Sequence, residues 1–160
     1  MSLIKVKEFF KSKNLEDRIV EHEESSATVE HAAAVIGCNP KQIAKTMSFL
    51  IGEKPILIVV SGDAKIDNSK YKAYFNQKAI MIPFDKVEEL IGHNPGGICP
   101  FVVNEKVKIY LDISLKRFDI VYTGAGNESS TIKIAIDELE KYSNSIDWID
   151  VCKNWNTEED

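Results

Sequence analysis

The sequence predicts an α+β fold, with a mixed and partly barrel-like β-sheet surrounded by helices. Three observations favour this class over a parallel βαβ series. Strand-like runs occur in pairs joined by short polar turns, helical segments separate the pairs, and no repeat or low-complexity linker interrupts the 160 residues. That length fits a single domain over residues 1–160, large enough to bury its own core.

Each expected helix combines a helical spacing of apolar residues with a signal at its end. Ser2 and Thr28 carry oxygens that can cap the first free amides of a helix, and Gly37 followed by Pro40 stops the second helix. The expected helices cover residues 3–10, 30–35, 68–75, 85–91 and 137–142, with Asn68 and Asp85 as the caps of the third and fourth and Gly92 ending the fourth.

Strands are expected where β-branched and aromatic residues run between turn residues. Gly52-Glu53-Lys54-Pro55 joins two such runs in a hairpin, and Asn104-Glu105-Lys106 predicts a second hairpin. A glycine loop separates two further strands. The expected strands cover residues 18–24, 45–51, 56–61, 79–82, 101–103, 107–112, 120–123 and 131–136.

The charge distribution argues against one class of function. A net charge of −5 disfavours a protein that wraps long DNA or RNA, because non-specific affinity comes from neutralising many phosphates. Residues 41–78 nevertheless hold seven lysines against three acids, whereas residues 137–160 hold eight acids against two lysines. A local basic face could therefore hold the end of a nucleic acid, with residues 154–160 as an acidic tail.

The three cysteines, Cys38, Cys99 and Cys152, are far apart and form no Cys-x-x-Cys pairing, which disfavours a disulfide framework or a structural zinc site. No window approaches an apolar membrane span, and residues 1–14 form an amphipathic stretch rather than a leader peptide. We therefore expect reduced thiols, no membrane association and a cytoplasmic location.

The most informative side chain is Lys45. It lies where a loop after Pro40 turns into an apolar strand, so its ammonium group would leave a rigid element near the mouth of the sheet. A lysine is a compact charge suited to a phosphate or a developing oxyanion, and the adjacent Thr46 hydroxyl is a second polar group. A solvated surface lysine and an ordinary strand threonine are the common alternatives.

Two glycine loops offer exposed main chain. In Pro95-Gly96-Gly97 the proline fixes one φ, and the two glycines leave peptide groups without a Cβ in the way. Amides there could bind an ester oxyanion, and a carbonyl could orient water. Gly124-Ala125-Gly126, before Ser129, is similar in kind, although each loop alone is typical of a plain turn. One ammonium beside two such loops suits a substrate with both a phosphate and a carbonyl, which points to an aminoacylated nucleotide.

Two other chemistries remain open from the residues alone. The histidines could form a metal site with a carboxylate, although no two have the i, i+4 spacing of a helical zinc motif. Cys99 with His93 could form a nucleophile pair, with a buried structural thiol as the alternative. The candidate metal ligands are His22, His31, His93, Glu23 and Asp112.

The ordered combination of Ala44-Lys45-Thr46, then Gly92 to Phe101, then Ala125-Gly126 with Ser129, resembles the YbaK family, also called the prolyl-tRNA synthetase associated domain. The similarity runs over about residues 22–142. Members of that family are freestanding or inserted editing domains that hydrolyse misacylated tRNA, typically alanine or cysteine attached to the proline tRNA. The resemblance also implies a compact mixed α/β or barrel-like sheet.

The resemblance implies roles for individual residues. The family's essential lysine falls on Lys45, and its glycine loop falls on Gly96 and Gly97, so these three are the expected catalytic residues. His93 and Cys99 depart from what relatives often carry. The expected substrate-binding residues are Thr46, His93, Asp112, Gly126 and Ser129.

The resulting hypothesis is a deacylase that acts in trans and hydrolyses the ester of misacylated tRNA without a metal, a cofactor or a protein nucleophile. A small pocket would separate Ala, Ser or Cys from larger amino acids, as double-sieve editing requires. The expected partners are the acceptor end of an aminoacyl-tRNA and, from the resemblance, prolyl-tRNA synthetase, with no DNA. A non-catalytic module that binds a tRNA end or a synthetase is the alternative, and a metal hydrolase is the third possibility.

Overall fold

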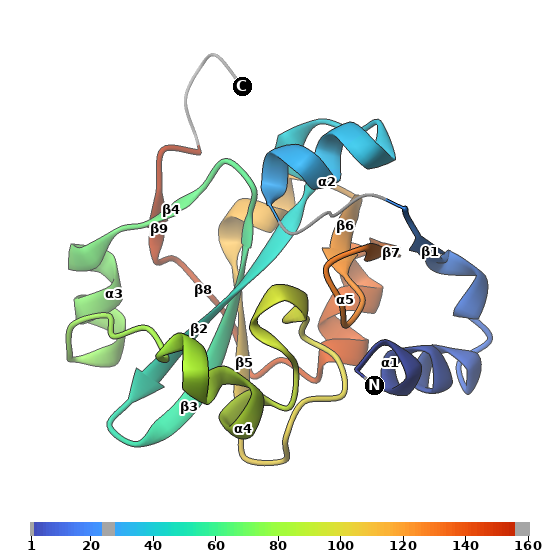
Figure 1. Cartoon of the computed structure of the whole chain (residues 1–160). Helices are drawn as coiled ribbons and strands as arrows, with labels where there is room; N and C mark the ends of the chain where they lie inside the picture. The colour runs from blue at the N-terminus through green and yellow to red at the C-terminus, as the bar shows by residue number, and fades with distance from the viewer. Residues whose placement is uncertain (1, 24–27, 156–160) are drawn as a thin grey trace.

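Three β-sheets organise the chain in a computed structural model that describes residues 2–23 and 28–155 (Figure 1). The largest sheet has the order β2-β3-β5-β8, the second has the order β1-β7-β6, and β4 pairs with β9. The strands are β1 (Ile19–Glu21), β2 (Ala44–Ile51), β3 (Lys54–Ser61), β4 (Lys65–Ile66), β5 (Lys108–Asp112), β6 (Ile120–Gly124), β7 (Ser130–Ala135), β8 (Asp147–Ile149) and β9 (Cys152–Lys153).

The two larger sheets meet at the start of β2. An isolated parallel bridge joins Ile43 to Tyr122, so the first residues of β2 lie beside β6. In the largest sheet β2 and β3 are antiparallel, whereas β3 pairs with β5, and β5 with β8, in parallel. The predicted α+β class with a mixed, partly barrel-like sheet is therefore confirmed. The junction of β2 with β6 lies next to the Lys45 motif.

Within residues 2–23 and 28–155, five α-helices surround the sheets, together with short 3₁₀ turns. The α-helices are α1 (Ser2–Lys11), α2 (Val29–Ile36), α3 (Asn68–Phe75), α4 (Val87–Ile91) and α5 (Ile136–Ser143). The 3₁₀ turns are η1 (Glu16–Arg18), η2 (Pro40–Gln42), η3 (Phe84–Lys86), η4 (Pro95–Gly97) and η5 (Ile113–Arg117). None of the helices in the described ranges is long and apolar enough to cross a membrane.

The ends of α2 follow from the residues that flank it. The Thr28 side chain accepts a hydrogen bond from the His31 amide, and Gly37 takes a left-handed φ of 83° at the other end. At α3 the cap is Asp67, one residue earlier than expected, and its side chain accepts from the amides of Ser69 and Lys70. Asp85 lies within η3, and the cap position of α4 is Lys86, so the predicted cap at Asp85 is wrong.

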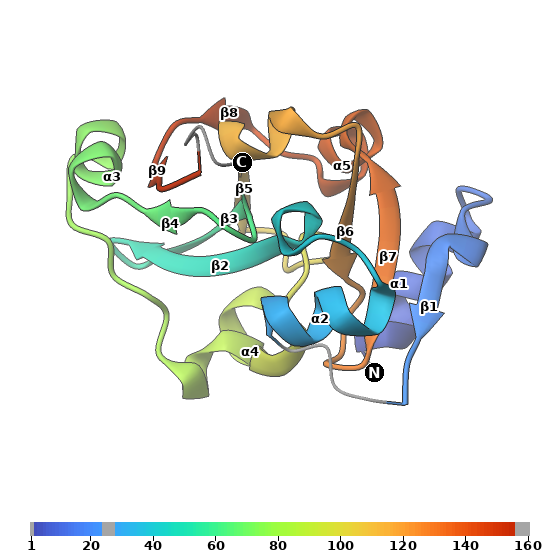
Figure 2. The same ribbon diagram turned by 90° about the horizontal axis from the view of Figure 1, so that it is seen from above.

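The side chains of β2 alternate between two hydrophobic cores. Ala44 belongs to the main core, while Phe49 belongs to a second core that also contains Tyr71 of α3. Because successive side chains of a strand point to opposite faces, Lys45 shares a face with Phe49, and Thr46 shares a face with Ala44. Figure 2 shows α2 and α4 on one side of β2, and β4 and β9 on the other.

The hairpin predicted over residues 101–112 is wrong. Val102 has a φ of 55°, which interrupts an extended run, and the Asn104 amide donates to the Ile91 carbonyl of α4. The segment therefore packs on α4, and β5 pairs in parallel with strands that are distant in sequence.

Residues 79–82 form only one bridge, between Phe49 and Met81. The strand expected over residues 18–24 is β1, which is shorter, at Ile19–Glu21. Glu24 and the acidic tail beyond residue 155 lie outside the described residues.

Candidate functional site

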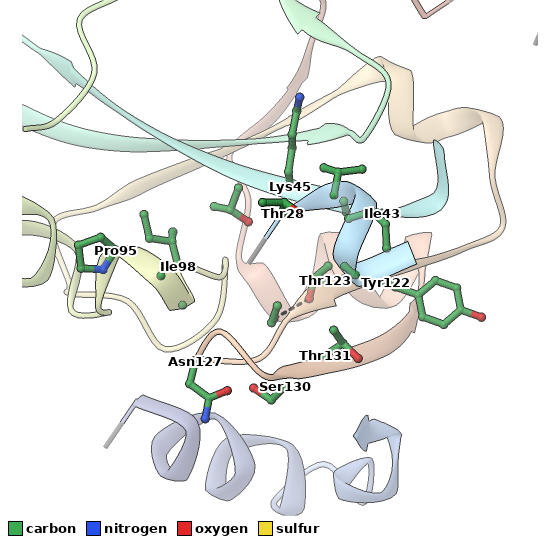
Figure 3. A pocket seen from close by; sticks show the side chains of 17 residues that line it. Thr28, Ile43, Lys45, Pro95, Ile98, Tyr122, Thr123, Asn127, Ser130 and Thr131 are labelled. Atoms are coloured by element: carbon green, nitrogen blue, oxygen red, sulfur yellow. Dashed lines mark hydrogen bonds between the residues drawn. The ribbon is translucent and has the colours of Figure 1, made fainter. Parts of the chain in front are cut away.

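A cavity of about 140 Å³ lies where the two larger sheets meet (Figure 3). Its walls come from α2, the first residues of β2, the η4 turn after α4, and the strands β6 and β7 near their connection. All three sequence motifs contribute to it, through Thr46, Gly97 and Gly124 among others. The structure therefore brings together residues as far apart in the chain as Thr28 and Thr131.

Hydroxyl groups dominate the polar part of the cavity wall. Thr46 Oγ1 and Ser130 Oγ are buried and have no hydrogen-bond partner within the described part of the chain. By contrast, Thr123 Oγ1 donates to the Gly124 carbonyl over 2.9 Å. A buried hydroxyl without a partner costs about 1–3 kcal/mol. The positions of Thr46 and Ser130 are thus suited to a ligand that supplies polar groups.

We expect Thr46→Val and Ser130→Ala each to raise the free energy of unfolding, by up to about 1–3 kcal/mol, because each removes an unpaired buried hydroxyl. Thr123→Val is the matched control, since it removes a hydroxyl that already has a partner in the same cavity, and we expect it to lower the free energy of unfolding. Urea or thermal unfolding of the three variants measures this. A loss of stability in all three would contradict the assignment of two unpaired hydroxyls.

The η4 turn forms a strap across one side of the cavity. Its amides are engaged within the turn: the Gly96 amide donates to Asn94 Oδ1 over 3.1 Å, and the Gly97 amide donates to the Asn94 carbonyl over 2.8 Å. The expectation that these two amides bind an ester oxyanion is therefore corrected, because both already have acceptors. The expected role of a glycine carbonyl in orienting water remains a proposal.

The two glycine loops pack directly against each other. A Cβ added at Gly97 would lie 2.5 Å from Asn127 Cα and 2.6 Å from the Gly126 carbonyl atoms. On the outer side of this contact is a second hollow of about 430 Å³, lined in part by Gly96, Gly97 and Asn127. Glu88 and Glu128 also line this second hollow. The glycine contact therefore forms a thin partition between an inner cavity and an outer hollow.

Lys45 contributes to the cavity wall, but its amine does not enter the cavity. Figure 3 shows the side chain extending from β2 away from Pro95 and Asn127. Burial lowers the pKa of the Lys45 ammonium, and the charged groups that act on it include Cys152, Lys65 and Asp63. The expectation that the ammonium and the glycine loops converge in one cavity is therefore corrected, because the amine lies on the β4–β9 side of β2.

His93 and Cys99 form a buried pair outside the cavity. The Cys99 Sγ lies 3.6 Å from His93 Nε2, which also makes a 2.6 Å hydrogen bond with the Phe101 carbonyl. Burial raises the pKa of the Cys99 thiol to about 12, and desolvation lowers the pKa of His93. A neutral thiol is a poor nucleophile. The pair is therefore a structural contact, and His93 does not line either hollow.

Asp112 is also structural in this fold. It is fully buried at the end of β5, and its two carboxylate oxygens each accept a backbone amide over 2.9 Å, from Ser114 and from Val151. Asp112 thereby caps η5 and ties the chain beyond β8 to the sheet. It does not line either hollow, which corrects its predicted place in a substrate pocket.

The second glycine loop places its residues unequally. Gly126 lines the outer hollow, whereas Ser129 lines neither hollow. The Ser129 amide donates to Asn127 Oδ1 over 3.0 Å, and its carbonyl accepts from the His22 amide over 2.7 Å. The neighbouring Ser130 and Thr131 take the positions in the inner cavity.

The histidines lie apart from one another. His31 is exposed on α2, His93 is buried next to Phe101, and His22 contacts β7. No group of three or more His, Cys, Asp or Glu side chains that could hold a metal ion occurs among the residues described.

Sequence reasoning missed several lining residues, among them Thr28, Tyr122, Ser130 and Thr131. Thr28 was read only as a helix cap, which it is. Ser130 and Thr131 immediately follow a loop that was identified, so the signal was present in the sequence. Their direction depends on the register between β6 and β7, in which Gly124 faces Thr131.

The fold and cavity define a class of small α+β proteins with a hydroxyl-lined cavity closed by glycine loops. The profile of the family described as aminoacyl-tRNA editing domain matches residues 23–142, and the chain belongs to this family. The uncharacterized protein YwhH of Bacillus subtilis is 47% identical over 156 residues, which are 97% of this chain and 99% of that protein.

Two further proteins resemble this chain over part or most of its length. The proline–tRNA ligase of Staphylococcus aureus is 30% identical over 102 residues, which are 63% of this chain but only 18% of the ligase. The crystal structure of a candidate trans-editing enzyme for prolyl-tRNA synthetase has a TM-score of 0.84 at 24% identity and covers 95% of this chain and 97% of its own. At that identity the second similarity establishes the fold.

Proposed function

We propose that this chain is an aminoacyl-tRNA deacylase that acts in trans on misacylated tRNA. The observation that carries the proposal is the small cavity with two unpaired buried hydroxyls, in a chain that belongs to the aminoacyl-tRNA editing domain family. The cavity is of a size that admits a short side chain, and its polar wall can hold the ester end of the substrate. The activity would need no metal.

In the proposed mechanism the aminoacyl ester enters the inner cavity and water attacks its carbonyl. A carbonyl of Gly96 or Gly97 orients the water, and the hydroxyls of Thr46 and Ser130 hydrogen-bond to the ester or its tetrahedral intermediate. The carbonyl carbon gains the oxygen of water, and the ester bond to the ribose breaks. The 2′- or 3′-hydroxyl of the terminal adenosine assists the proton transfer to the departing oxygen.

We propose a small amino acid, such as alanine or cysteine on the proline tRNA, as the substrate. A short side chain fits within the 140 Å³ cavity, and double-sieve editing requires a site that admits only the smaller amino acid. The similarity to a segment of a proline–tRNA ligase supports the proline tRNA, and makes prolyl-tRNA synthetase the proposed protein partner. Gly126 and the outer hollow would lie next to the terminal nucleotide.

A panel of mischarged tRNAs tests the proposal. We expect the wild-type protein to release labelled alanine or cysteine from proline tRNA faster than the spontaneous rate, to leave correctly charged prolyl-tRNA intact, and to keep its activity in the presence of a chelator. Release from no member of the panel would contradict the deacylase assignment. Loss of activity with the chelator would contradict the metal-independent mechanism.

A non-catalytic module that binds a tRNA end is the second candidate function. The engaged amides of Gly96 and Gly97 favour it, because neither is free to stabilise an oxyanion in this conformation. The same panel separates the two functions, since a binding module would slow the spontaneous loss of the amino acid or leave it unaltered.

A further inference from the structure

The hydroxyl of Thr131, in the wall of the inner cavity, makes a hydrogen bond with the ring of His22. Thr131 lines the cavity and is 5% exposed, and its Oγ1 lies 2.9 Å from His22 Nε2. His22 follows directly after β1, and its amide donates to the Ser129 carbonyl over 2.7 Å. The pairing of β1 with β7, in which Val20 faces Thr131, fixes the ring beside the hydroxyl.

This contact distinguishes Thr131 from the other cavity hydroxyls. Thr46 and Ser130 have no partner in the described chain, so their hydrogens can rotate toward any ligand, and the Thr123 hydroxyl is turned to its own backbone. A hydroxyl has one hydrogen to donate and two lone pairs. If Thr131 donates that hydrogen to His22 Nε2, its lone pairs are left for the cavity, and it becomes a fixed acceptor.

The substrate of the proposed deacylase requires a hydrogen-bond acceptor in the wall of the inner cavity. An aminoacyl ester carries an α-ammonium group, which has only donors. The described residues that line the inner cavity include no aspartate, glutamate or histidine, so the acceptors for this cation are hydroxyl and carbonyl oxygens. A hydroxyl whose direction is set before binding spares the cost of ordering it during binding.

We propose, on the basis of the proposed function, that His22 is a positioning residue that makes Thr131 an acceptor for the α-ammonium group of the aminoacyl end. His22 does not touch the substrate. Its Nε2 accepts a hydrogen bond from the Thr131 hydroxyl, and the oxygen of Thr131 accepts a hydrogen bond from the ammonium. The pair thereby provides recognition of the amino group, which is separate from the recognition of the side chain by size.

The alternative is that the contact only ties β1 to β7. In that case removing it would lower stability without changing which ligands bind. The two explanations are separated by a pair of non-hydrolysable probes: 3′-alanylamido-3′-deoxyadenosine, and its 3′-propionylamido counterpart, which lacks only the amino group. Affinities are measured by calorimetry for the full chain and its variants, together with unfolding temperatures.

We expect wild type to prefer the alanyl probe by roughly ten- to a hundredfold, the size of one charge-assisted hydrogen bond. His22→Leu and Thr131→Val should each abolish that preference, and the double variant should be no worse than either single one, because both remove the same contact. His22→Gln should retain most of the preference, since its carboxamide oxygen can accept from Thr131. His31→Leu, at an exposed histidine of α2, is the control and should behave as wild type.

Three results would overturn the inference: no preference of wild type for the alanyl probe, an unchanged preference in His22→Leu, or a loss in His22→Gln as complete as in His22→Leu. Because the probes cannot be hydrolysed, these results do not depend on the deacylation assay. Failure of wild type to hydrolyse any mischarged tRNA would contradict the proposed function, whereas the probe affinities alone decide the role of His22.

Discussion

Gly97→Ala is expected to destabilise the protein strongly and to abolish deacylation, whereas Gly96→Ala should leave both nearly unchanged. A Cβ at Gly97 would lie 2.5 Å from Asn127 Cα and 2.6 Å from the carbonyl carbon and oxygen of Gly126. These are backbone atoms of the second glycine loop, so one loop must move. At Gly96 the closest atom is Glu128 Oε2 at 3.4 Å, the end of a flexible side chain.

The size of the effect follows from overpacking. Inserting a methyl group into a fully packed contact costs about 1–3 kcal/mol, and more where backbone must shift. The partition between the inner cavity and the outer hollow would open or tilt, so the activity should fall further than the loss of folded protein explains. Unfolding midpoints and deacylation rates of the two variants measure this. Equal stability of Gly96→Ala and Gly97→Ala would contradict the close approach of the two loops.

The sequence identified the segments of the site better than the atoms that face it. A lysine at the start of an apolar strand and loops rich in proline and glycine are unusual residue types at those places. Three segments that share a cavity could therefore be predicted from residue types alone. Which atoms of those segments point inward depends on pairing across the fold. Ser129 and Ser130 illustrate this, because the pairing of β7 with β6 and β1 decides which of them lines the cavity. The amides of Gly96 and Gly97 are a different case, because their acceptors lie on Asn94 in the same turn.

The errors in the fold have the same physical origin. The helices and the β2–β3 hairpin follow from local caps, turns and periodicity, and they were predicted with near-correct bounds. The parallel partners of β5 are distant in sequence, and no local pattern specifies them. Asp112 illustrates the consequence: a carboxylate at the end of a strand resembles a pocket residue until its two amide partners, one of them 39 residues away, are known.

Lys45→Met is expected to raise the free energy of unfolding near neutral pH. No hydrogen bond or ion pair of the amine is found within the described residues, and burial lowers the pKa of the ammonium below 10.5. The unfolded chain therefore binds this proton more tightly than the folded chain. Wild-type stability should rise as the pH increases from the lowered pKa toward 10.5, and the advantage of Lys45→Met should shrink over that range.

Deacylation, by contrast, should be lost in Lys45→Met. Binding an anion of the substrate would explain why the chain keeps a half-buried ammonium that lowers its stability. In the proposed reaction that anion is a phosphate of the tRNA acceptor end. Lys65 lies near enough to disfavour the charge on Lys45, so a phosphate there would meet two positive groups. The acceptor end would then cross the start of β2 to bring its ester into the cavity.

Lys54→Met, at an exposed lysine beside the β2–β3 turn, is the control and should retain wild-type activity. Full activity in Lys45→Met would contradict this role and leave the hydroxyl wall and the glycine loops as the whole of the site.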